Sequence, residues 1–170
     1  EIMYDKVQDY ITSLVPPREP ELQKMEEIAE KNDFPIIGPA CGYYCYQLAR
    51  MINAKSVFEL GSGYGYSTAW FAIAVKENGG GVVHHTVWDD DLSKRAQRHL
   101  SAMGLAELVR FHNAEAVETL RQTTGPFDII FNDIDKEGYL DSLQVTKEKL
   151  RHGGVLIVDN MIWHGQTLDP

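Results

Sequence analysis

Two apolar stretches of the sequence run directly into groups that can do chemistry. One ends in Asp133, Asp135 and Lys136, and the other, VLIV, ends in Asp159 and Asn160. Carboxylate and amide oxygens are the ligands that a hard divalent cation such as Mg²⁺ prefers. A lysine three residues after Asp133 can take the proton of a hydroxyl group or hold the anion that forms. These residue types therefore fit a reaction in which a hydroxyl oxygen is activated beside a cation.

Each stretch also has a plainer interpretation when it is taken alone. D-I-D-K fits the N-cap of a helix with a compensating lysine. V-L-I-V-D-N fits a strand that ends in an Asx turn. The two together favour a site, because neighbouring parallel strands bring their carboxyl ends to the same edge of a sheet.

A third group of candidate residues is the glycine-rich turn ELGSGYGYS at 59–67. Glycines after a strand let the backbone approach a ligand closely, although a tight strand–helix link also uses them. Tyr66 stands where the dinucleotide fingerprint needs Gly or Ala, and no Lys-Ser or Lys-Thr pair follows. Glu59 is expected to face the ligand and to repel a pyrophosphate. The turn therefore favours S-adenosylmethionine, which carries a sulfonium, an ammonium and a ribose but no phosphate.

Alternating strands and helices must position these residues. Apolar, β-branched segments recur from residue 57 onward and are separated by helical patterns. Such an order predicts an α/β fold with a doubly wound, mainly parallel sheet, in which ligands bind at the carboxyl ends of the strands. The predicted strands are 57–60, 82–88, 109–114, 127–133 and 155–160, and the predicted helices are 67–77, 92–104, 116–122 and 139–150.

The N-terminal third is helical in character. Apolar residues repeat at helical spacing up to Leu14, and residues 20–32 form a second amphipathic stretch. Residues 34–42 are predicted to be a loop rich in Pro and Gly, followed by a helix. We expect one domain over 1–170, with N-terminal helices in 1–55 and a cofactor- and metal-binding α/β core in 56–165.

Composition excludes several other classes of protein. The 170 residues carry a net charge of -9, which argues against a nucleic acid or an anionic membrane as partner. The sequence contains no apolar run long enough to cross a bilayer and no signal-peptide pattern at its start. Cys41 and Cys45 lie four residues apart, a spacing that predicts two reduced thiols rather than a disulfide or zinc site. We expect a cytoplasmic domain.

Three segments together carry a family likeness: ELGSGYGYST, FDIIFNDIDKEGYL and LRHGGVLIVDNMIWHG. In this order and spacing the chain resembles the class I cation-dependent O-methyltransferases of the caffeoyl-CoA and catechol type, over roughly residues 34–165. The resemblance implies a Rossmann-like methyltransferase sheet, S-adenosylmethionine as cofactor and a divalent cation, with Mg²⁺ ahead of Mn²⁺ and Ca²⁺. It also implies a small hydroxylated aromatic acceptor and a homodimer.

The resemblance assigns roles to residues of all three segments. It implies that Lys136 is the general base and that Asp133 is shared by catalysis, the cation and the cofactor. Trp163 would border the acceptor pocket. The remaining cofactor-binding residues would be Glu59, Gly61, Ser62, Gly63, Tyr66, Ser67 and Glu115, and the cation would be bound by Asp133, Asp159 and Asn160.

The chain departs from the family pattern in three places. Val87 stands where the family has an acid for the ribose hydroxyls, so Asp89 is the candidate for that role and Asp90 its rival. Ala114 replaces a glycine before Glu115. The family continues beyond W-H-G with two more strands, which we expect to be absent here, so that the acceptor pocket is open or completed by residues outside the given sequence.

The sequence therefore predicts transfer of a methyl group from S-adenosylmethionine to a hydroxyl of a small vicinal dihydroxy-aromatic, assisted by a divalent cation. Two bound substrate oxygens and three protein ligands would nearly fill the six positions around Mg²⁺. Two alternatives stay open. One is a metal-independent methyltransferase that relies on Lys136 with another acceptor, and the other is a cofactor-binding homologue without catalysis.

Overall fold

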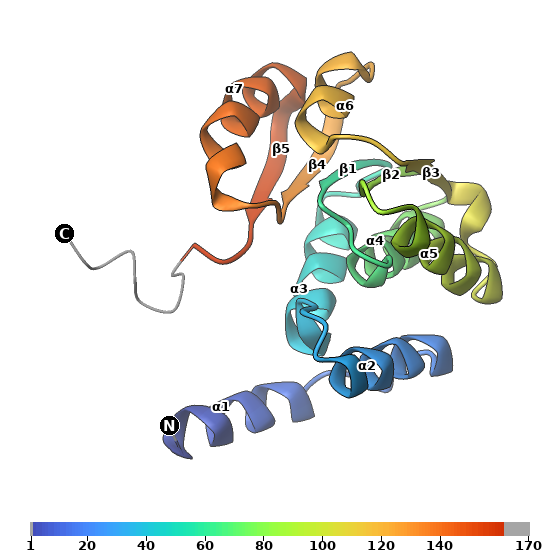
Figure 1. Cartoon of the computed structure of the whole chain (residues 1–170), viewed down its shortest axis with the longest axis vertical. Coiled ribbons are helices and arrows are strands. Elements are labelled where there is room, and N and C mark those ends of the chain that lie inside the picture. The colour runs from blue at the N-terminus through green and yellow to red at the C-terminus, as the bar shows by residue number, and fades with distance from the viewer. Residues whose placement is uncertain (1, 162–170) are drawn as a thin grey trace.

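A five-stranded parallel sheet forms the centre of the protein (Figure 1). The computed structural model describes residues 2–161. The strand order is β3-β2-β1-β4-β5, so the chain reverses its direction of travel between β1 and β4. The prediction of a doubly wound parallel sheet is confirmed. The strands are β1 (Ser56–Leu60), β2 (Val82–Thr86), β3 (Val109–His112), β4 (Phe127–Asn132) and β5 (Leu150–Val158).

Helices cover both faces of the sheet. One core is formed with α2 to α5, and a second, smaller core with α6 and α7. In Figure 1, α1 and α2 lie at one end of the molecule, away from β5, α6 and α7. The helices are α1 (Ile2–Ser13), α2 (Pro20–Asn32), α3 (Gly38–Met51), α4 (Tyr66–Glu77), α5 (Asp90–Ala102), α6 (Ala116–Gln122) and α7 (Tyr139–Lys149), with short 3₁₀ turns η1 (Ala106–Leu108) and η2 (Lys136–Gly138).

Side chains alternate between the two cores along each strand. Val57 packs in the core with α4, whereas Phe58 packs in the core with α6 and α7. Because this alternation has a period of two, Glu59 lies on the same side of the sheet as Val57. On the neighbouring strand, His85 shares the side of Val83 and is fully buried. The sheet thus directs two polar side chains, Glu59 and His85, towards α4.

The segment 34–42 was predicted as a loop, but it is helical from Gly38 onward. Pro39 lies in the first turn of α3, where a helix needs no N–H from the residue. Gly42 lies inside the helix because α3 approaches α4 closely, and a Cβ there would lie 2.1 Å from Trp70 Nε1. The Pro and Gly residues of this segment therefore start and pack a helix.

The predicted strand ends also shift by a few residues. β5 begins five residues before the predicted start at 155, because Leu150 already pairs with Phe127 of β4. The register then shifts, and regular pairing resumes at Val155 after Gly153, which has a left-handed conformation. β5 ends at Val158, which leaves Asp159 and Asn160 free at the edge of the sheet. β2 ends at Thr86 rather than at residue 88, so that Trp88 lies in the following turn.

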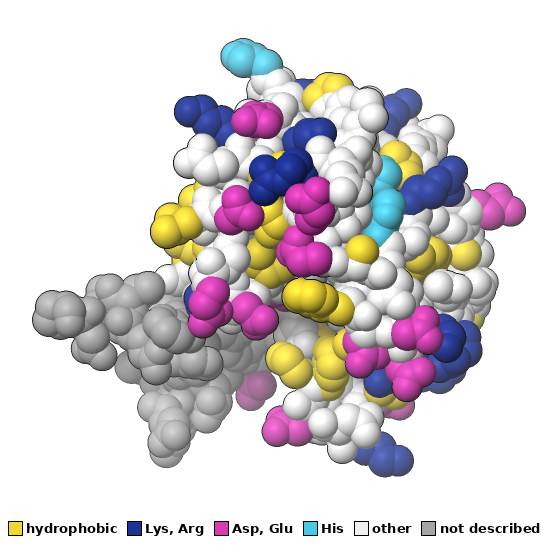
Figure 2. Space-filling view, turned by 45° about the horizontal axis from the view of Figure 1, so that its top comes forward, with side chains coloured by type: hydrophobic (Ala, Val, Ile, Leu, Met, Phe, Trp, Pro, Cys, Tyr) yellow, Lys and Arg dark blue, Asp and Glu magenta, His cyan; other side chains and the backbone are white. Residues whose placement is uncertain are grey.

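The surface of the described chain is mixed in charge. On the face shown in Figure 2, carboxylates lie between the Lys and Arg side chains, so the basic side chains form no continuous stripe there. Within residues 2–161, no helix is both long and apolar enough to cross a membrane. Cys41 and Cys45 are both free thiols, as the sequence predicted.

Candidate active site

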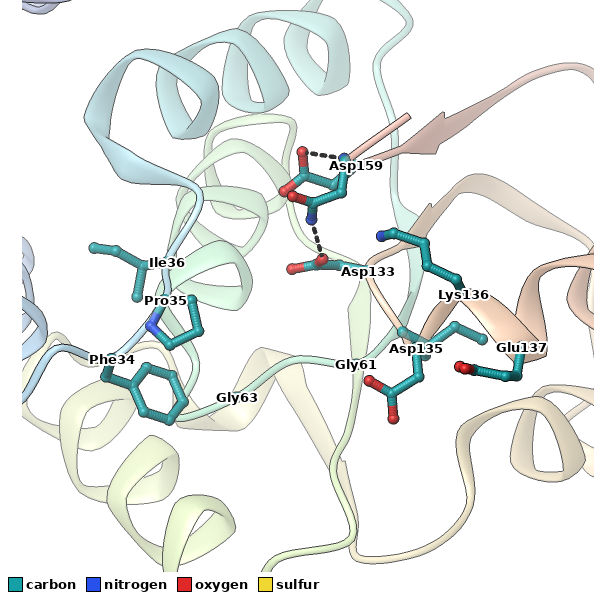
Figure 3. Close-up of a pocket in the computed structure, with 12 residues that line it drawn as sticks. Phe34, Pro35, Ile36, Gly61, Gly63, Asp133, Asp135, Lys136, Glu137 and Asp159 are labelled. Atoms are coloured by element: carbon teal, nitrogen blue, oxygen red, sulfur yellow. Dashed lines mark hydrogen bonds between the residues drawn. The ribbon is translucent and has the colours of Figure 1, made fainter. Parts of the chain in front are cut away.

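A hollow of about 550 Å³ opens at the carboxyl ends of β1, β4 and β5 (Figure 3). This is the edge of the sheet where the sequence placed the site, next to the reversal between β1 and β4. An apolar wall from the segment before α3 faces a rim of carboxylates. The lining residues are Phe34, Pro35, Ile36, Gly61, Gly63, Asp133, Ile134, Asp135, Lys136, Glu137, Asp159 and Asn160.

The glycine turn after β1 forms the floor of this hollow and lies against the end of β4. Gly61 has φ +79°, and a Cβ there would lie 2.3 Å from the carbonyl oxygen of Asp133. Only glycine can join the two strand ends this closely. Ser62 fixes the turn to β2, because its backbone N–H donates to the carbonyl of Thr86 at 2.9 Å and its Oγ accepts from the Thr86 N–H at 3.0 Å.

Glu59 lies beneath this turn rather than in the open hollow. Its side chain is fully buried, and Thr68 Oγ1 donates to its Oε2 at 2.5 Å. Burial raises the pKa of Glu59 to about 7, while the nearby hydroxyls of Ser67, Thr68 and Ser62 oppose that rise. Glu59 therefore does not line the open hollow, since the direction of a strand-end side chain depends on the packing of α4, and its role at the cofactor stays a prediction.

Ser62 and Ser67 separate Glu59 from a small cavity. That cavity, of about 40 Å³, is lined by both serines together with Tyr66 and adjoins the main hollow at Gly61 and Asp133. Ser62, Tyr66 and Ser67 are all buried, at 5%, 3% and 7% exposure. These predicted cofactor residues therefore meet around one cavity, with Glu59 behind them.

The structure brings the three predicted cation ligands together. Asn160 Nδ2 donates to Asp133 Oδ1 at 3.1 Å, and the Asn160 N–H donates to Asp159 Oδ1 at 2.7 Å (Figure 3). Burial raises the pKa of Asp133 to about 6, and the charge of Asp159 raises it further, while Asn160 and Lys136 oppose. Two facing carboxylates with an amide beside them gain stability from a bound cation.

The donor set fits a hard divalent ion. Asp133, Asp159 and Asn160 all offer oxygen atoms, once the Asn160 amide turns its Oδ1 rather than its Nδ2 inward. Asn160 adopts a left-handed backbone conformation, with φ 59°, that holds the amide at the rim. Among residues 2–161 no group of three His, Cys, Asp or Glu side chains is placed to hold a metal ion, so the fit rests on two carboxylates and one amide.

Lys136 is held by a residue that the sequence did not single out. Its Nζ donates to Tyr139 Oη at 3.0 Å and lies 4.7 Å from the centre of the Tyr139 ring. Tyr139 Oη in turn donates to the carbonyl of Asp159 at 2.8 Å. The spacing of three residues across a helical turn was the available signal for this pair. Asp135 lines the hollow and makes no side-chain hydrogen bond within the described chain.

A second hollow of about 280 Å³ continues past Gly61 on the other side of Asp133. Trp88, which is 73% exposed, and Glu115 line its far end. Glu115 caps α6, and its carboxylate accepts from the N–H groups of Val117 and Glu118. A tryptophan at the carboxyl end of a strand was the available signal for Trp88 in the sequence.

The candidates for the ribose lie to the side of this second hollow. Asp89 caps α5 and accepts from the Leu92 N–H at 2.9 Å. Asp90 forms an ion pair with Lys94 and accepts from Asn113 Nδ2 at 3.3 Å. Val87, at the position of the family's acid, is 8% exposed. Neither Asp89 nor Asp90 lines the hollow beside Trp88. The predicted acceptor residue Trp163 lies outside the described residues.

The two hollows form one elongated site. They share Gly61, Asp133, Ile134 and Asp135, so a long ligand can reach from Trp88 past Gly61 to the carboxylate rim. Lys136 is the one cationic side chain lining the main hollow of the described chain. The site can therefore hold an adenosyl group at one end and an oxygen nucleophile with a cation at the other.

The known sequences that are similar to this chain are those of O-methyltransferases. The sequence model of a family described as O-methyltransferase matches residues 16–170. A catechol O-methyltransferase from Niastella koreensis is 31% identical over 98% of this chain and 77% of its own length. Caffeoyl-CoA O-methyltransferase 1 from Eucalyptus globulus is 29% identical over 96% of this chain and 69% of its own length.

Solved structures give the same result. The O-methyltransferase TomG from Streptomyces achromogenes, in complex with S-adenosylmethionine, is 29% identical and has a TM-score of 0.86 over 97% of this chain and 76% of that chain. An O-methyltransferase from Bacillus cereus, in complex with S-adenosylhomocysteine, is 25% identical and has a TM-score of 0.87 over 96% of this chain and 76% of that chain. Similar folds thus carry the cofactor and its product.

Proposed function

The chain belongs to the O-methyltransferase family and is dependent on S-adenosylmethionine, and we propose that its acceptor is a small vicinal dihydroxy-aromatic held with a divalent cation. One observation carries this proposal. The carboxyls of Asp133 and Asp159 and the amide of Asn160 meet at the ends of β4 and β5, and the pKa of Asp133 is raised to about 6 by burial and by the charge of Asp159. Such a pair suits a cation that itself binds the two oxygens of a catechol.

The cofactor would lie along the two hollows. Its adenine would stack on Trp88 near Glu115, and its amino-acid end would reach the cavity at Ser62 and Ser67, above Glu59. Gly61 and Gly63 leave room for it, and Asp133 would border its methyl-bearing end. S-adenosylmethionine supplies the methyl group as a sulfonium. For the ribose hydroxyls, Asp89 remains the first candidate and Asp90 the second.

Asp133, Asp159 and Asn160 would hold the cation; Mg²⁺ is the first candidate from the family resemblance, and Mn²⁺ and Ca²⁺ stay open because all three ions take oxygen ligands. When bound, such an ion lowers the pKa of an acceptor hydroxyl and fixes its orientation. The protein's own contribution is the placement of the three ligands. Tyr139 keeps the Asp159 backbone in position through its hydrogen bond to the carbonyl oxygen.

Lys136 would manage the acceptor proton. Its Nζ, uncharged, takes the proton of the attacking hydroxyl, or, as an ammonium, it holds the phenolate by a hydrogen bond. In the transfer an oxygen–carbon bond forms while the sulfur–carbon bond breaks, and the proton leaves through Nζ to solvent. Phe34, Pro35 and Ile36 form the apolar wall against which an aromatic acceptor would pack.

A methylation assay on matched acceptors tests the proposal. We expect turnover of catechol with Mg²⁺, loss of turnover with EDTA, and recovery after Mg²⁺ is restored. We expect little turnover of 2-methoxyphenol, because one of the two oxygens is blocked. Turnover that ignores EDTA would identify a metal-independent methyltransferase instead. Calorimetric binding of S-adenosylhomocysteine without turnover on any catechol would identify a non-catalytic homologue.

A homodimer is a further part of the proposal. The helix α1 carries apolar side chains that stay exposed in the described chain: Val7 at 50%, Tyr10 at 65% and Ile11 at 42%. A second copy would cover this face, as the family resemblance implies. Light scattering after size exclusion tests this, and Tyr10→Glu should shift the molecular mass from two chains to one.

A further inference from the structure

Three polar side chains form a buried chain beneath the glycine turn. Glu59, Thr68 and His85 come from β1, α4 and β2, and all three are 0% exposed. Thr68 Oγ1 lies 2.5 Å from Glu59 Oε2 and 3.0 Å from His85 Nδ1. None of these contacts is needed to bind a cation or an acceptor, so the chain requires an explanation of its own.

The hydrogen atoms of this chain can be assigned. A threonine hydroxyl has a single hydrogen, and Thr68 gives it to Glu59. Burial lowers the pKa of His85 to about 3, so the imidazole is neutral at ordinary pH. Its Nδ1 must then carry the hydrogen and donate it to Thr68 Oγ1, since Thr68 has none left. Of the side-chain atoms of these three residues, Glu59 Oε1 and His85 Nε2 have no hydrogen-bond partner within residues 2–161.

The surroundings of Glu59 favour its uncharged form in the protein without ligand. Its neighbours on α4 are neutral hydroxyls, and on β2 the neutral His85 reaches it through Thr68. On α3 its neighbour is the thiol of Cys45, which is also uncharged because burial raises its pKa to about 12. From the end of β4 the carboxyl of Asp133 adds repulsion. No cationic side chain of the described chain contributes to this environment. The carboxyl thus holds its proton up to a pH of about 7.

We propose that Thr68 and His85 are positioning residues that hold Glu59 as a proton-linked anchor for the cofactor. The carboxyl carries a proton on Oε1 when the site is empty, so that Oε2 still accepts from Thr68. When the ammonium of the cofactor's amino-acid end enters the cavity at Ser62 and Ser67, the Glu59 O–H bond breaks and the proton passes to solvent. The ammonium brings one positive charge as the proton takes one away, so the ammonium balances the negative charge of the buried carboxylate. This inference concerns the cofactor alone and does not depend on the proposed acceptor or cation.

His85 has a specific part in this arrangement. By donating to Thr68, its Nδ1–H occupies the threonine oxygen and leaves the hydroxyl hydrogen directed at Glu59 Oε2. Without that donor, Thr68 can turn its hydroxyl towards a backbone carbonyl of its own helix, as threonines in helices commonly do. Glu59 would then lose its orientation. His84, the neighbouring residue on β2, points to the other core and bonds to His112 instead.

Calorimetry in two buffers of different ionisation enthalpy measures the proton directly. The titrations are made on the full chain in EDTA, with S-adenosylhomocysteine as probe, so that neither cation nor turnover takes part. We expect release of roughly half a proton at pH 7, because the pKa of Glu59 is about 7, and nearly one at pH 6. The matched probe 5′-methylthioadenosine lacks the amino-acid end and should release none. Equal release with both probes, or none with either, overturns the inference.

Variants distinguish a role in positioning Glu59 from a general effect on the stability of the protein. Glu59→Gln should abolish proton release. Thr68→Val and His85→Phe should weaken S-adenosylhomocysteine roughly tenfold, the effect of one buried hydrogen bond to a charged group, and shift the pH at which release occurs. Thr68→Ser and His85→Gln keep the donors and should recover most of both effects. His84→Phe, the matched control in the same strand, should change neither.

Thermal unfolding of each variant shows whether it folds. If His85→Phe does not fold, the comparison of Thr68→Val with Thr68→Ser carries the same test. Proton release that persists in Glu59→Gln, or a His84→Phe variant that behaves like His85→Phe, contradicts the inference.

Discussion

Two carboxyl groups on either side of Gly61 illustrate how differently the two halves of the site are built. Glu59, in the cofactor half, is fully buried among neutral hydroxyls, and burial raises its pKa to about 7, with a smaller contribution from the charge of Asp133. Asp133, in the rim half, faces Asp159 and Asn160, and both burial and a second carboxylate raise its pKa to about 6. The first is isolated inside the protein, and the second belongs to an open cluster.

The difference indicates what each half lacks. An isolated buried carboxyl with neutral neighbours gains from one positive charge placed nearby by a ligand. Two facing carboxylates at an open rim gain from an ion that several oxygens share. The cofactor half should therefore respond to ligand charge and proton concentration, and the rim half to divalent cations.

The largest effect should come from the rim. Asp133→Asn removes one charged ligand of the proposed cation, and we expect kcat/KM for catechol to fall by about 10²- to 10³-fold. The Kd of S-adenosylhomocysteine, measured by calorimetry, should change by less than about fivefold. A variant that loses cofactor affinity and keeps kcat would reverse the proposed roles of the two halves.

The pH dependence of stability should distinguish the two carboxyls next. For Glu59 the folded pKa of about 7 lies above the ordinary value of 4.5, so the unfolded chain loses this proton first as pH rises. The associated stability is complete below pH 4.5 and is lost as pH rises to about 7, in total about 3 kcal/mol for the ligand-free protein.

Urea unfolding in EDTA from pH 4 to 8 checks this dependence. Glu59→Gln should remove the part of the pH dependence of the unfolding free energy that extends to pH 7. Asp133→Asn should remove only the part between 3.8 and about 6, with the same sign. Identical profiles for the two variants would mean that the two halves do not differ as described.

A smaller effect is expected at the far end of the cofactor half. Trp88→Ala should weaken S-adenosylhomocysteine about tenfold, because stacking of an adenine on an indole is lost. Trp88→Phe should restore most of the affinity. Calorimetric titration measures the affinity in each variant, and kcat at saturating cofactor should stay near that of the wild type. Unchanged affinity in Trp88→Ala would place the adenine elsewhere.

The smallest effect should come from the support of Lys136. Tyr139→Phe removes the hydroxyl that joins Lys136 Nζ to the Asp159 carbonyl. We expect kcat for catechol to fall about fivefold, the effect of one hydrogen bond, with no change in the Kd of S-adenosylhomocysteine. Steady-state kinetics and calorimetry on the same preparation measure both. A fall in cofactor affinity instead would assign Tyr139 to the other half.

The rim half was the more predictable of the two from sequence. Asp133 and Asp159 follow two strands that pair in register, and adjacent parallel strands necessarily place their carboxyl ends together. The sheet itself follows from the alternation of apolar strands with helices. Asn160 Nδ2 lies 3.1 Å from Asp133 Oδ1, so the ends of these two strands do meet.

The cofactor half was less predictable because it depends on side-chain packing. The helix α4 covers Glu59, and Thr68 of that helix forms a hydrogen bond to it. Both contacts depend on the position of the helix, which no local sequence pattern encodes. Trp88 was missed because the strand was expected to continue to residue 88, and it ends at Thr86. The start of α3 at Gly38 was missed because Pro39 signals both a loop and a first helical turn.

Binding of Mn²⁺ measured by electron paramagnetic resonance tests the central difference most directly. The signal of free Mn²⁺ reports the number of ions bound to the full chain at each concentration. We predict one saturable site per chain in the wild type and in Glu59→Gln, and loss of that site in both Asp133→Asn and Asp159→Asn. Absence of saturable binding in the wild type, or binding that survives in both aspartate variants, would contradict a cation site at the rim.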